Sequence, residues 1–322
     1  MDMPKVTIAL ITYNRTDYLL QAINAILVQS YKDFELIIMD NGSTTQTYEL
    51  VEPYLNNQIK YDRNPINSRD YINESFLMAQ GKYLLITHDD DMMLPNMLER
   101  EVAILDGNNN CALVSCNTTI INEYGIIVKD KGLDYNYNKT YKQYEYIESF
   151  FKNELIFFCP TVMLRKSFFI DNNLNFKSEV GPAHDNYLWF ETNLHPVDLV
   201  FIAEPLYCYR VHSKQDGFAN AFTMELILFP KVIDLLLSKL SMNEAKPYLK
   251  LITERSVYNS AFAYHLKKIT KREFTSNIVR YKRDLKTWDL FSIFDRCILF
   301  LIQHFNSLYI LLYKIYVRFK KL

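Results

Sequence analysis

The sequence lacks several features that would assign it to a common functional class. Its 322 residues carry 36 Lys and Arg against 37 Asp and Glu, whereas a dedicated nucleic-acid-binding domain is normally strongly basic. Its 5 cysteines are an odd number and include no Cys-x-x-Cys pair, so neither a disulfide framework nor a zinc site is indicated. Glycine is scarce, at 7 residues, and no Gly-x-Gly-x-x-Gly follows the first apolar run. A dinucleotide-dependent oxidoreductase is therefore disfavoured.

Targeting and membrane-spanning segments are also missing from the pattern. The first residues, Met1 to Val6, contain neither a basic region nor a small-residue cleavage site, so we expect no signal peptide and a cytoplasmic protein. Trp288 to Leu322 is rich in Leu, Ile, Phe and Tyr, but polar residues interrupt it within the about 20 apolar residues that a span needs. An amphipathic helix with a basic end, lying on the inner face of the cell membrane, fits this segment. Packing on the core or on a second subunit, which would make an oligomer, fits it equally.

Apolar strands alternate with helical patterns over the first 215 residues. Continuous apolar runs, typical of buried parallel strands, occur at Val6–Ile11, Phe34–Met39 and Tyr83–Thr87, and a helical pattern covers Ser68–Gln80. Further strands are predicted at Ile59–Tyr61, Ala112–Cys116, Thr161–Arg165, Val200–Ile202 and Leu206–Val211, with a hairpin around Asn122–Gly125. This alternation predicts an α/β fold, a mostly parallel sheet with helices on both faces. Helical patterns follow, so we expect a sheet domain at 1–215 and a helical region at 216–322.

Polar clusters follow three of the predicted strands at the point where each ends. These clusters are Asn14, Asp40 to Ser43, and Asp89 to Asp91. Because parallel strands end at one edge of a sheet, the clusters are expected to converge on one crevice. Three adjacent carboxylates repel one another, and Mg²⁺ or Mn²⁺ would offset that repulsion while binding the oxygens of a nucleotide diphosphate. An Asx turn is the alternative for Asp40 to Ser43, and a solvated acidic helix start is the alternative for Asp89 to Asp91.

Two later pairs of residues carry groups suited to catalysis. His184-Asp185 precedes a helix containing Trp189, which would place a general base beside an aromatic platform for a sugar at the mouth of the crevice. A helix N-cap is the alternative for Asp185. Arg210 and His212 would supply a phosphate-binding guanidinium and a metal-binding imidazole. Ordinary surface polar residues are the alternative for that pair.

Taken in order, these segments resemble glycosyltransferase family 2, with its GT-A fold. The resemblance covers about residues 4–215 and is carried by Thr12-Tyr13-Asn14-Arg15, Asp40-Asn41-Gly42-Ser43, Gly81-Lys82-Tyr83, Asp89-Asp90-Asp91 and His184-Asp185. The first hundred residues are also similar to the spore-coat polysaccharide glycosyltransferase of the family. The resemblance implies an inverting, metal-dependent transfer from a nucleotide diphosphate sugar, with UDP favoured, to a hydroxyl group of a glycan acceptor in surface polysaccharide biosynthesis. The family and the C-terminal segment together suggest a lipid-linked acceptor.

The resemblance also implies roles for single residues. Asp185 matches the catalytic base, and His184 and Trp189 lie toward the acceptor. Asp90, with Asp91 and His212 beside it, matches the ligand of Mn²⁺ or Mg²⁺; His88 stands where many members carry the first Asp, so the assignment within the triplet stays open. The residues matched to the nucleotide sugar are Thr12, Tyr13, Asn14, Arg15, Asp40, Asn41, Arg69, Asn73, Asp89 and Arg210. Among them, Tyr13 is expected to stack on the base and Asn41 replaces an Asp, which leaves uridine or thymidine open. A catalytically silent nucleotide-binding or scaffold protein of the same fold is the alternative function.

Overall fold

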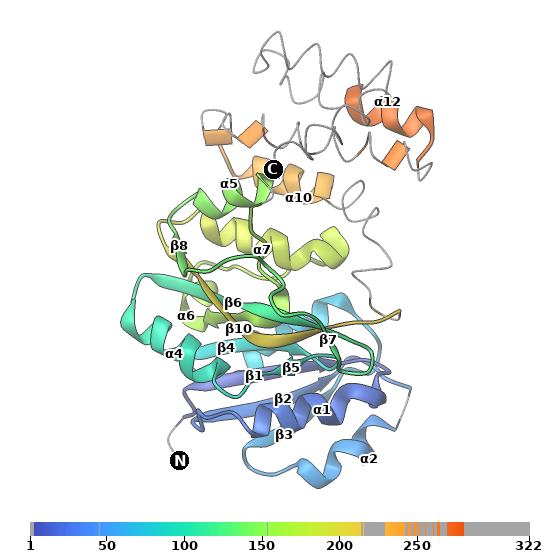
Figure 1. Cartoon of the computed structure of the whole chain (residues 1–322), viewed down its shortest axis with the longest axis vertical. Coiled ribbons are helices and arrows are strands. Elements are labelled where there is room, and N and C mark those ends of the chain that lie inside the picture. The colour runs from blue at the N-terminus through green and yellow to red at the C-terminus, as the bar shows by residue number, and fades with distance from the viewer. Residues whose placement is uncertain are drawn as a thin grey trace. The chain divides into compact units, whose positions relative to one another are not determined.

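The computed structural model describes residues 3–44, 46–152, 154–213, 215, 229–241, 244–245, 248–249, 251, 255, 260, 263–264 and 269–279. The chain divides into two compact units, one of Met1–Ile147 and Leu155–Ala219, the other of Glu148–Glu154 and Asn220–Leu322. The first unit is a mixed α/β structure with helices packed around a central sheet (Figure 1). The functions assigned above to 1–215 and 216–322 stay predictions.

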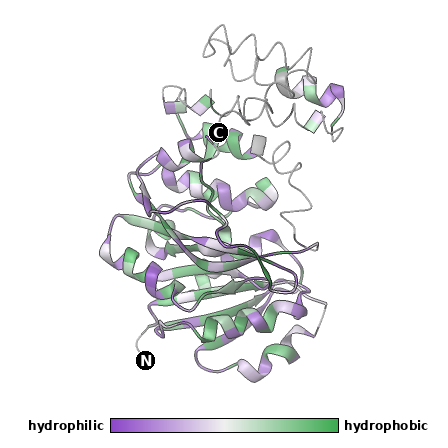
Figure 2. Cartoon of the chain, viewed as in Figure 1, coloured by the Kyte–Doolittle hydropathy of each residue, from purple (hydrophilic) through white to green (hydrophobic). Residues whose placement is uncertain are grey.

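Four parallel strands form the N-terminal half of the sheet. They are β1 (Val6–Thr12), β2 (Phe34–Asp40), β3 (Ile59–Arg63) and β4 (Tyr83–His88), in the order β3-β2-β1-β4. Strands β1 and β2 are buried along almost their whole length, because neighbouring strands and helices cover both their edges and their faces. Figure 2 shows this part of the sheet as largely hydrophobic. The predicted strands are confirmed here, and all four end at the same edge.

The other half of the sheet mixes strand directions. Strand β9 (Val162–Arg165) runs antiparallel between β4 and β6 (Cys111–Asn122), and β6 pairs in parallel with β10 (Asp198–Val211). The short strands β5 (Met92–Met93), β7 (Ile127–Lys129) and β8 (Lys139–Tyr141) pair with β10, β6 and β10 in turn. The sequence predicts two strands where β10 is one. Pro205 lies at register shifts along the β6–β10 ladder, so the proline produces a bulge and does not end the strand.

Helices connect the strands of the first unit. The α-helices of this unit are α1 (Thr16–Leu27), α2 (Thr47–Val51), α3 (Glu74–Met78), α4 (Met97–Gly107), α6 (Lys166–Asp171) and α7 (His184–Asn193). A further helix, α5 (Glu145–Phe151), begins in this unit, and its residues from Glu148 onward belong to the second. The 3₁₀ turns are η1 (Glu52–Tyr54), η2 (Arg69–Asn73), η3 (Cys159–Thr161) and η4 (Ser178–Ala183). The helix predicted at Ser68–Gln80 is thus a 3₁₀ turn followed by a short α-helix. Apolar residues of α1 at helical spacing, among them Leu19, Ile23 and Ile26, join the core of the sheet.

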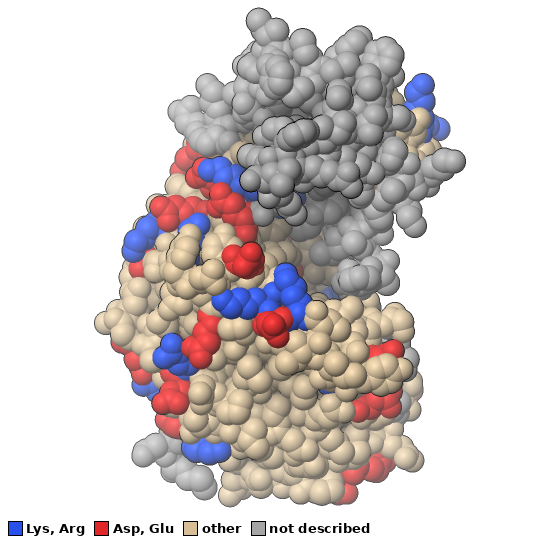
Figure 3. Space-filling view, viewed as in Figure 1, with Lys and Arg blue, Asp and Glu red and all other residues tan. Residues whose placement is uncertain are grey.

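The second unit contains α10 (Phe229–Ser238) and α12 (Lys271–Val279). Val232, Ile233 and Leu236 of α10 are buried, as the helical pattern of the sequence predicts. Among the described residues, no helix combines the length and the apolar character that crossing a bilayer requires. The predicted helix from Trp288 to Leu322 lies outside the described residues. Acidic and basic side chains are intermixed on the described surface in view (Figure 3), in keeping with the balanced charge of the sequence.

Candidate active site

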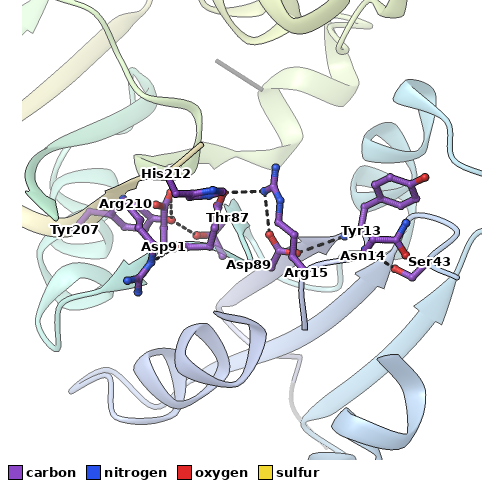
Figure 4. A network of polar contacts seen from close by, with 11 residues as sticks. Tyr13, Asn14, Arg15, Ser43, Thr87, Asp89, Asp91, Tyr207, Arg210 and His212 are labelled. Atoms are coloured by element: carbon purple, nitrogen blue, oxygen red, sulfur yellow. Dashed lines mark hydrogen bonds and ion pairs between the residues drawn. The ribbon is translucent and has the colours of Figure 1, made fainter. Parts of the chain in front are cut away.

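The ends of β1 and β4 bring an arginine onto the acidic triplet. Asp89, Asp90 and Asp91 are only 1–2% exposed, which rules out the alternative of a solvated acidic helix start. The Arg15 guanidinium lies 3.2 Å from a carboxylate oxygen of Asp89 and 2.8 Å from one of Asp90. The Tyr13 backbone N–H also donates to Asp89, at 3.4 Å (Figure 4). Positive charge from one strand end therefore stabilises the buried carboxylates of another.

Asp90 has the environment of a cation ligand. Its Oδ2 accepts from Arg15 and lies 3.0 Å from His212 Nε2, whereas its Oδ1 is buried with no hydrogen-bond partner. Burial opposes ionisation, but His88, Arg15 and His212 together hold the pKa of Asp90 below its ordinary value. His88, Asp90 and Asp91 each offer a ligand atom, and these atoms lie within 4.8 Å of one another. An ionised carboxylate with an orphaned oxygen, beside an imidazole and a second carboxylate, suits a divalent metal.

The candidate metal group differs from the predicted set in one residue. The sequence indicates Asp90, Asp91 and His212, but the structure groups His88 with the two aspartates, while His212 faces Asp90. The signal for His88 is its place at the end of β4, directly before the triplet. Burial, and then the charge of Asp90, raise the pKa of Asp89 to about 7 and that of Asp91 well above its ordinary value. Burial and the charge of a neighbouring carboxylate thus raise the pKa of two members of the triplet, as expected for like charges this close.

Arg210 does not have the role that the sequence predicts. It is 1% exposed, and its guanidinium donates to the Asp90 carbonyl at 2.7 Å, to Gln21 at 3.0 Å and to two carbonyls at the β6–β7 turn. Its backbone N–H donates to Asp91 at 2.7 Å. Because the guanidinium is bonded to the protein, it does not take the predicted role of a phosphate ligand. Arg210 instead holds the backbone of Asp90 and the side chain of Asp91 in place. The alternative of a surface pair is also wrong, since His212 is buried too.

The end of β2 contacts the end of β1. The Asn14 backbone N–H donates to Ser43 Oγ at 3.0 Å, and Asn14 Oδ1 accepts from the Thr44 backbone at 2.8 Å. Thr12 is buried, and its carbonyl accepts from the Asn41 backbone N–H at 2.9 Å. The convergence expected from the strand order is thus present. Tyr13 is 43% exposed, and its predicted stacking on a base stays a prediction.

Asp40 and Asn41 use their side chains inside the protein. Asp40 accepts from the Ser43 backbone at 2.8 Å and from the Tyr61 hydroxyl at 2.6 Å. The Asn41 amide donates to the Ser68 carbonyl at 3.0 Å and accepts from the Ser68 N–H at 2.9 Å. Gly42, the residue after Asn41, has a φ of +81°. A Cβ at this position would come within 2.7 Å of the backbone of Ile66 and Asn67. The turn interpretation explains these contacts, and the roles of both residues toward a nucleotide stay predictions.

Asp185 occupies the second position of α7 and not its N-cap, which is Ala183. It is partly exposed, and one of its oxygens accepts from the backbone N–H and the side-chain amide of Asn186, at 2.7 and 2.9 Å. Desolvation by the surrounding protein outweighs these bonds and raises the pKa of Asp185 to about 6. A carboxylate that titrates near neutrality and is reachable from solvent is suited to general base catalysis.

Asp185 and the acidic triplet act on a common neighbour. Burial and then the charges of Asp91, Asp90 and Asp185 all raise the pKa of Tyr209. At His184 the direction is the opposite, because burial and the positive charges of Arg69 and His88 disfavour the protonated ring and lower its pKa to about 4. The start of α7 therefore lies within the electrostatic reach of the strand-end cluster. Tyr209 belongs to this neighbourhood too, although no role is predicted for it from the sequence.

The prediction that Trp189 forms an aromatic platform for a sugar is wrong. Trp189 is 1% exposed, and residues 186–193 of α7 are all buried, so the indole belongs to the core and does not form a platform at the mouth of a crevice. The sequence gives no warning of this burial, because an aromatic residue on a helix has the same pattern at a core and at a surface position. Arg69 is exposed on η2, and Asn73 at the end of η2 bonds to the backbone of Phe176. Their predicted contacts with the donor stay predictions.

The order of the strands and the polar cluster at their ends fit a GT-A type fold. The sequence profile described as glycosyl transferase family 2 matches residues 7–172, just over half of the chain. The chain belongs to this family. An uncharacterized glycosyltransferase of Methanocaldococcus jannaschii, MJ1057, is 26% identical over 67% of this chain and 74% of its own length.

Solved structures show the same fold at low sequence identity. TarS 1-349 of Staphylococcus aureus in complex with UDP-GlcNAc has a TM-score of 0.59 at 15% identity, covering 88% of this chain and 92% of that one. The mannosyltransferase PcManGT of Pyrobaculum calidifontis, in complex with GDP-Man and Mn²⁺, has a TM-score of 0.55 at 14% identity and covers 88% of each chain. The predicted family and fold class are thereby confirmed, and the protein is a glycosyltransferase.

Proposed function

We propose that this glycosyltransferase is metal-dependent and inverting, and that it moves a sugar from a nucleotide diphosphate donor, a UDP-sugar in the first place, to a glycan hydroxyl group. The observation that carries the proposal is Asp90, a buried carboxylate with lowered pKa and one unpaired oxygen at the strand ends. Proteins of similar fold bind UDP-GlcNAc, or GDP-Man with Mn²⁺, which supports a nucleotide-sugar donor here. A silent scaffold would have no use for an orphaned carboxylate oxygen, which costs free energy to bury.

His88, Asp90 and Asp91 are the residues that would hold a divalent cation, Mn²⁺ or Mg²⁺. When bound, the cation supplies positive charge that neutralises the departing nucleotide diphosphate. His212 and Arg15 orient the Asp90 carboxylate from one side, which leaves its other oxygen for the ligand. Such supporting bonds fix the direction in which a metal ligand points.

Asp185 would accept the proton of the acceptor hydroxyl as that oxygen attacks the anomeric carbon. The new carbon–oxygen bond forms on the face opposite to the bond that breaks toward the diphosphate, so the configuration inverts. A pKa of about 6 keeps Asp185 mostly ionised at neutral pH while leaving it basic enough to take a proton. The exposed ring of Tyr13 offers a stacking surface for the base of the donor.

The cellular setting is proposed from the sequence. The amphipathic, basic C-terminal segment supports a peripheral position on the inner face of the cell membrane, where a lipid-linked acceptor would be reached. Surface polysaccharide synthesis is the corresponding process. Loss of binding to anionic lipid vesicles on removal of residues 288–322 is the expected result. Full-length protein that ignores such vesicles would contradict this setting.

The reaction is tested with a panel of UDP-, TDP- and GDP-sugars, Mn²⁺ or EDTA, and a set of glycan acceptors. We expect release of one nucleotide diphosphate that requires both metal and acceptor, and a product of inverted anomeric configuration by ¹H NMR. Retention of configuration, or equal rates in EDTA, would contradict the inverting or the metal-dependent part of the proposal.

A further inference from the structure

Asn73 joins two segments that lie 103 residues apart in the sequence. Its side-chain amide donates to the carbonyl of Phe176 at 3.0 Å, and its Oδ1 accepts from the backbone N–H of Phe176 at 3.0 Å. Both polar ends of the side chain are therefore bonded to one residue. A two-point contact of this kind fixes both the position and the orientation of the peptide backbone.

Phe176 transmits this contact to the start of α7. Its buried ring lies 5.1 Å, centroid to centroid, from the ring of His184, and 6.1 Å from that of Trp189. His184 and Trp189 flank Asp185 on the same helix. A displacement of Phe176 would open space against both neighbours, and close-packed interiors respond to such space by moving the side chains around it.

We propose that Asn73 is a positioning residue for Asp185, acting through the backbone and ring of Phe176. This inference rests on the proposed role of Asp185 as the base, and it replaces the donor contact expected of Asn73 from the sequence. Arg69, the residue expected at the diphosphate, begins the 3₁₀ turn that Asn73 ends. The turn η2 would thus connect the donor side of the site to the side that carries the base.

The packing is tested by fluorescence, which needs no substrate. The sequence contains 2 tryptophans, so Trp288→Phe leaves Trp189 as the single emitter. In this background we expect Asn73→Ala to shift the Trp189 emission to longer wavelength, because released packing admits water to the indole. Asn56→Ala is the matched control: its amide also bonds the backbone at both ends, but at the entrance to β3. An unchanged spectrum in Asn73→Ala would overturn the inference.

Kinetics separate positioning from donor binding. Asn73→Ala should bind UDP with Mn²⁺ within about twofold of the wild-type affinity, yet transfer about 10- to 100-fold more slowly at saturating donor, the range expected from misplacement of a catalytic group. Asn73→Asp keeps the acceptor for the Phe176 N–H and should recover part of the rate. Weakened UDP binding with a normal saturated rate would instead return Asn73 to the donor site and overturn the inference.

Asp185→Asn, assayed in parallel, keeps the two proposals distinguishable. An active Asp185→Asn would contradict the base itself. An inactive Asp185→Asn together with normal emission and a normal rate in Asn73→Ala would contradict the positioning role alone.

Discussion

The buried acidic triplet Asp89–Asp91 and the partly exposed carboxylate of Asp185 take their partners from different distances along the chain. Asp90 is held by Arg15 and His212, which are 75 and 122 residues away. Asp185 bonds to Asn186, the next residue. The distant partners carry positive charge or can acquire it, and the local one is a neutral amide.

This difference in partners sets the chemistry of each carboxylate. Charged groups around Asp90 favour the ionised form, which a metal ligand needs. At Asp185 desolvation dominates and the pKa rises to about 6, so the group can gain and lose a proton near neutral pH. Asp90 is thus kept ionised by charged residues from several strand ends, whereas Asp185 can exchange a proton because it is desolvated and has few partners.

The largest expected effect comes from removing the proton carrier. Asp185→Asn keeps the shape of the side chain but cannot take a proton, so transfer should fall by about 10²- to 10⁴-fold, the usual contribution of a general base. UDP affinity in the presence of Mn²⁺ should stay within about twofold, by calorimetry. Turnover at the wild-type rate would remove Asp185 from the mechanism.

A smaller loss should follow from breaking the fixed-charge group. Asp90→Ala removes the orphaned oxygen and the partner of Arg15, so the Mn²⁺-dependent part of UDP affinity should fall at least about 10- to 100-fold, the cost of disturbing even the outer partners of a metal. Lys32→Ala, which removes an exposed cation at the opposite end of the strands, is the control. Undiminished stimulation by Mn²⁺ in Asp90→Ala would place the metal elsewhere.

The pH dependence of transfer tests whether Asp185 is the group that must be ionised. Because the base must be ionised, the rate at saturating donor should fall about tenfold per pH unit below a pH near 6. The Asn186 amide lowers the pKa of Asp185, so Asn186→Ala should move this acid limb to higher pH. A limb that stays in place would show that the titrating group is not Asp185.

Glu101 in α4 is a buried carboxylate outside the two groups compared above, and it tests what burial alone does to stability. Burial raises its pKa well above the ordinary value, and the Cys116 thiol offsets this in part. Because the pKa of Glu101 is higher in the folded than in the unfolded state, its contribution to the free energy of unfolding is fully present below the unfolded-state pKa. This contribution is lost as the pH rises above that value, because the buried carboxyl group must then ionise or hold its proton at a cost. Glu101→Met should therefore increase the free energy of unfolding by about 1–3 kcal/mol at pH 7, with a smaller gain at pH 5, by thermal melts. Exposed Glu99→Met is the control; a gain independent of pH would contradict the explanation.

The sequence predicted the parts of the site that depend on local pattern. Apolar runs located β1, β2 and β4, and the polar residues after them marked the edge of the sheet at which the candidate site lies. The burial of Trp189 and Arg210 was not predictable, because their neighbours are supplied by segments far along the chain. The same holds for Asn73, whose partner Phe176 is 103 residues away.

A calorimetric titration with UDP, TDP, GDP and ADP, each with and without Mn²⁺, on the wild type, Asp90→Ala and Asp185→Asn tests the two groups of carboxylates together. We expect metal-dependent binding of one nucleotide, UDP in the first place, that is lost in Asp90→Ala and retained in Asp185→Asn. No response of the wild type to any nucleotide would contradict the donor site, and equal loss in both variants would contradict the division of labour between the two groups of carboxylates.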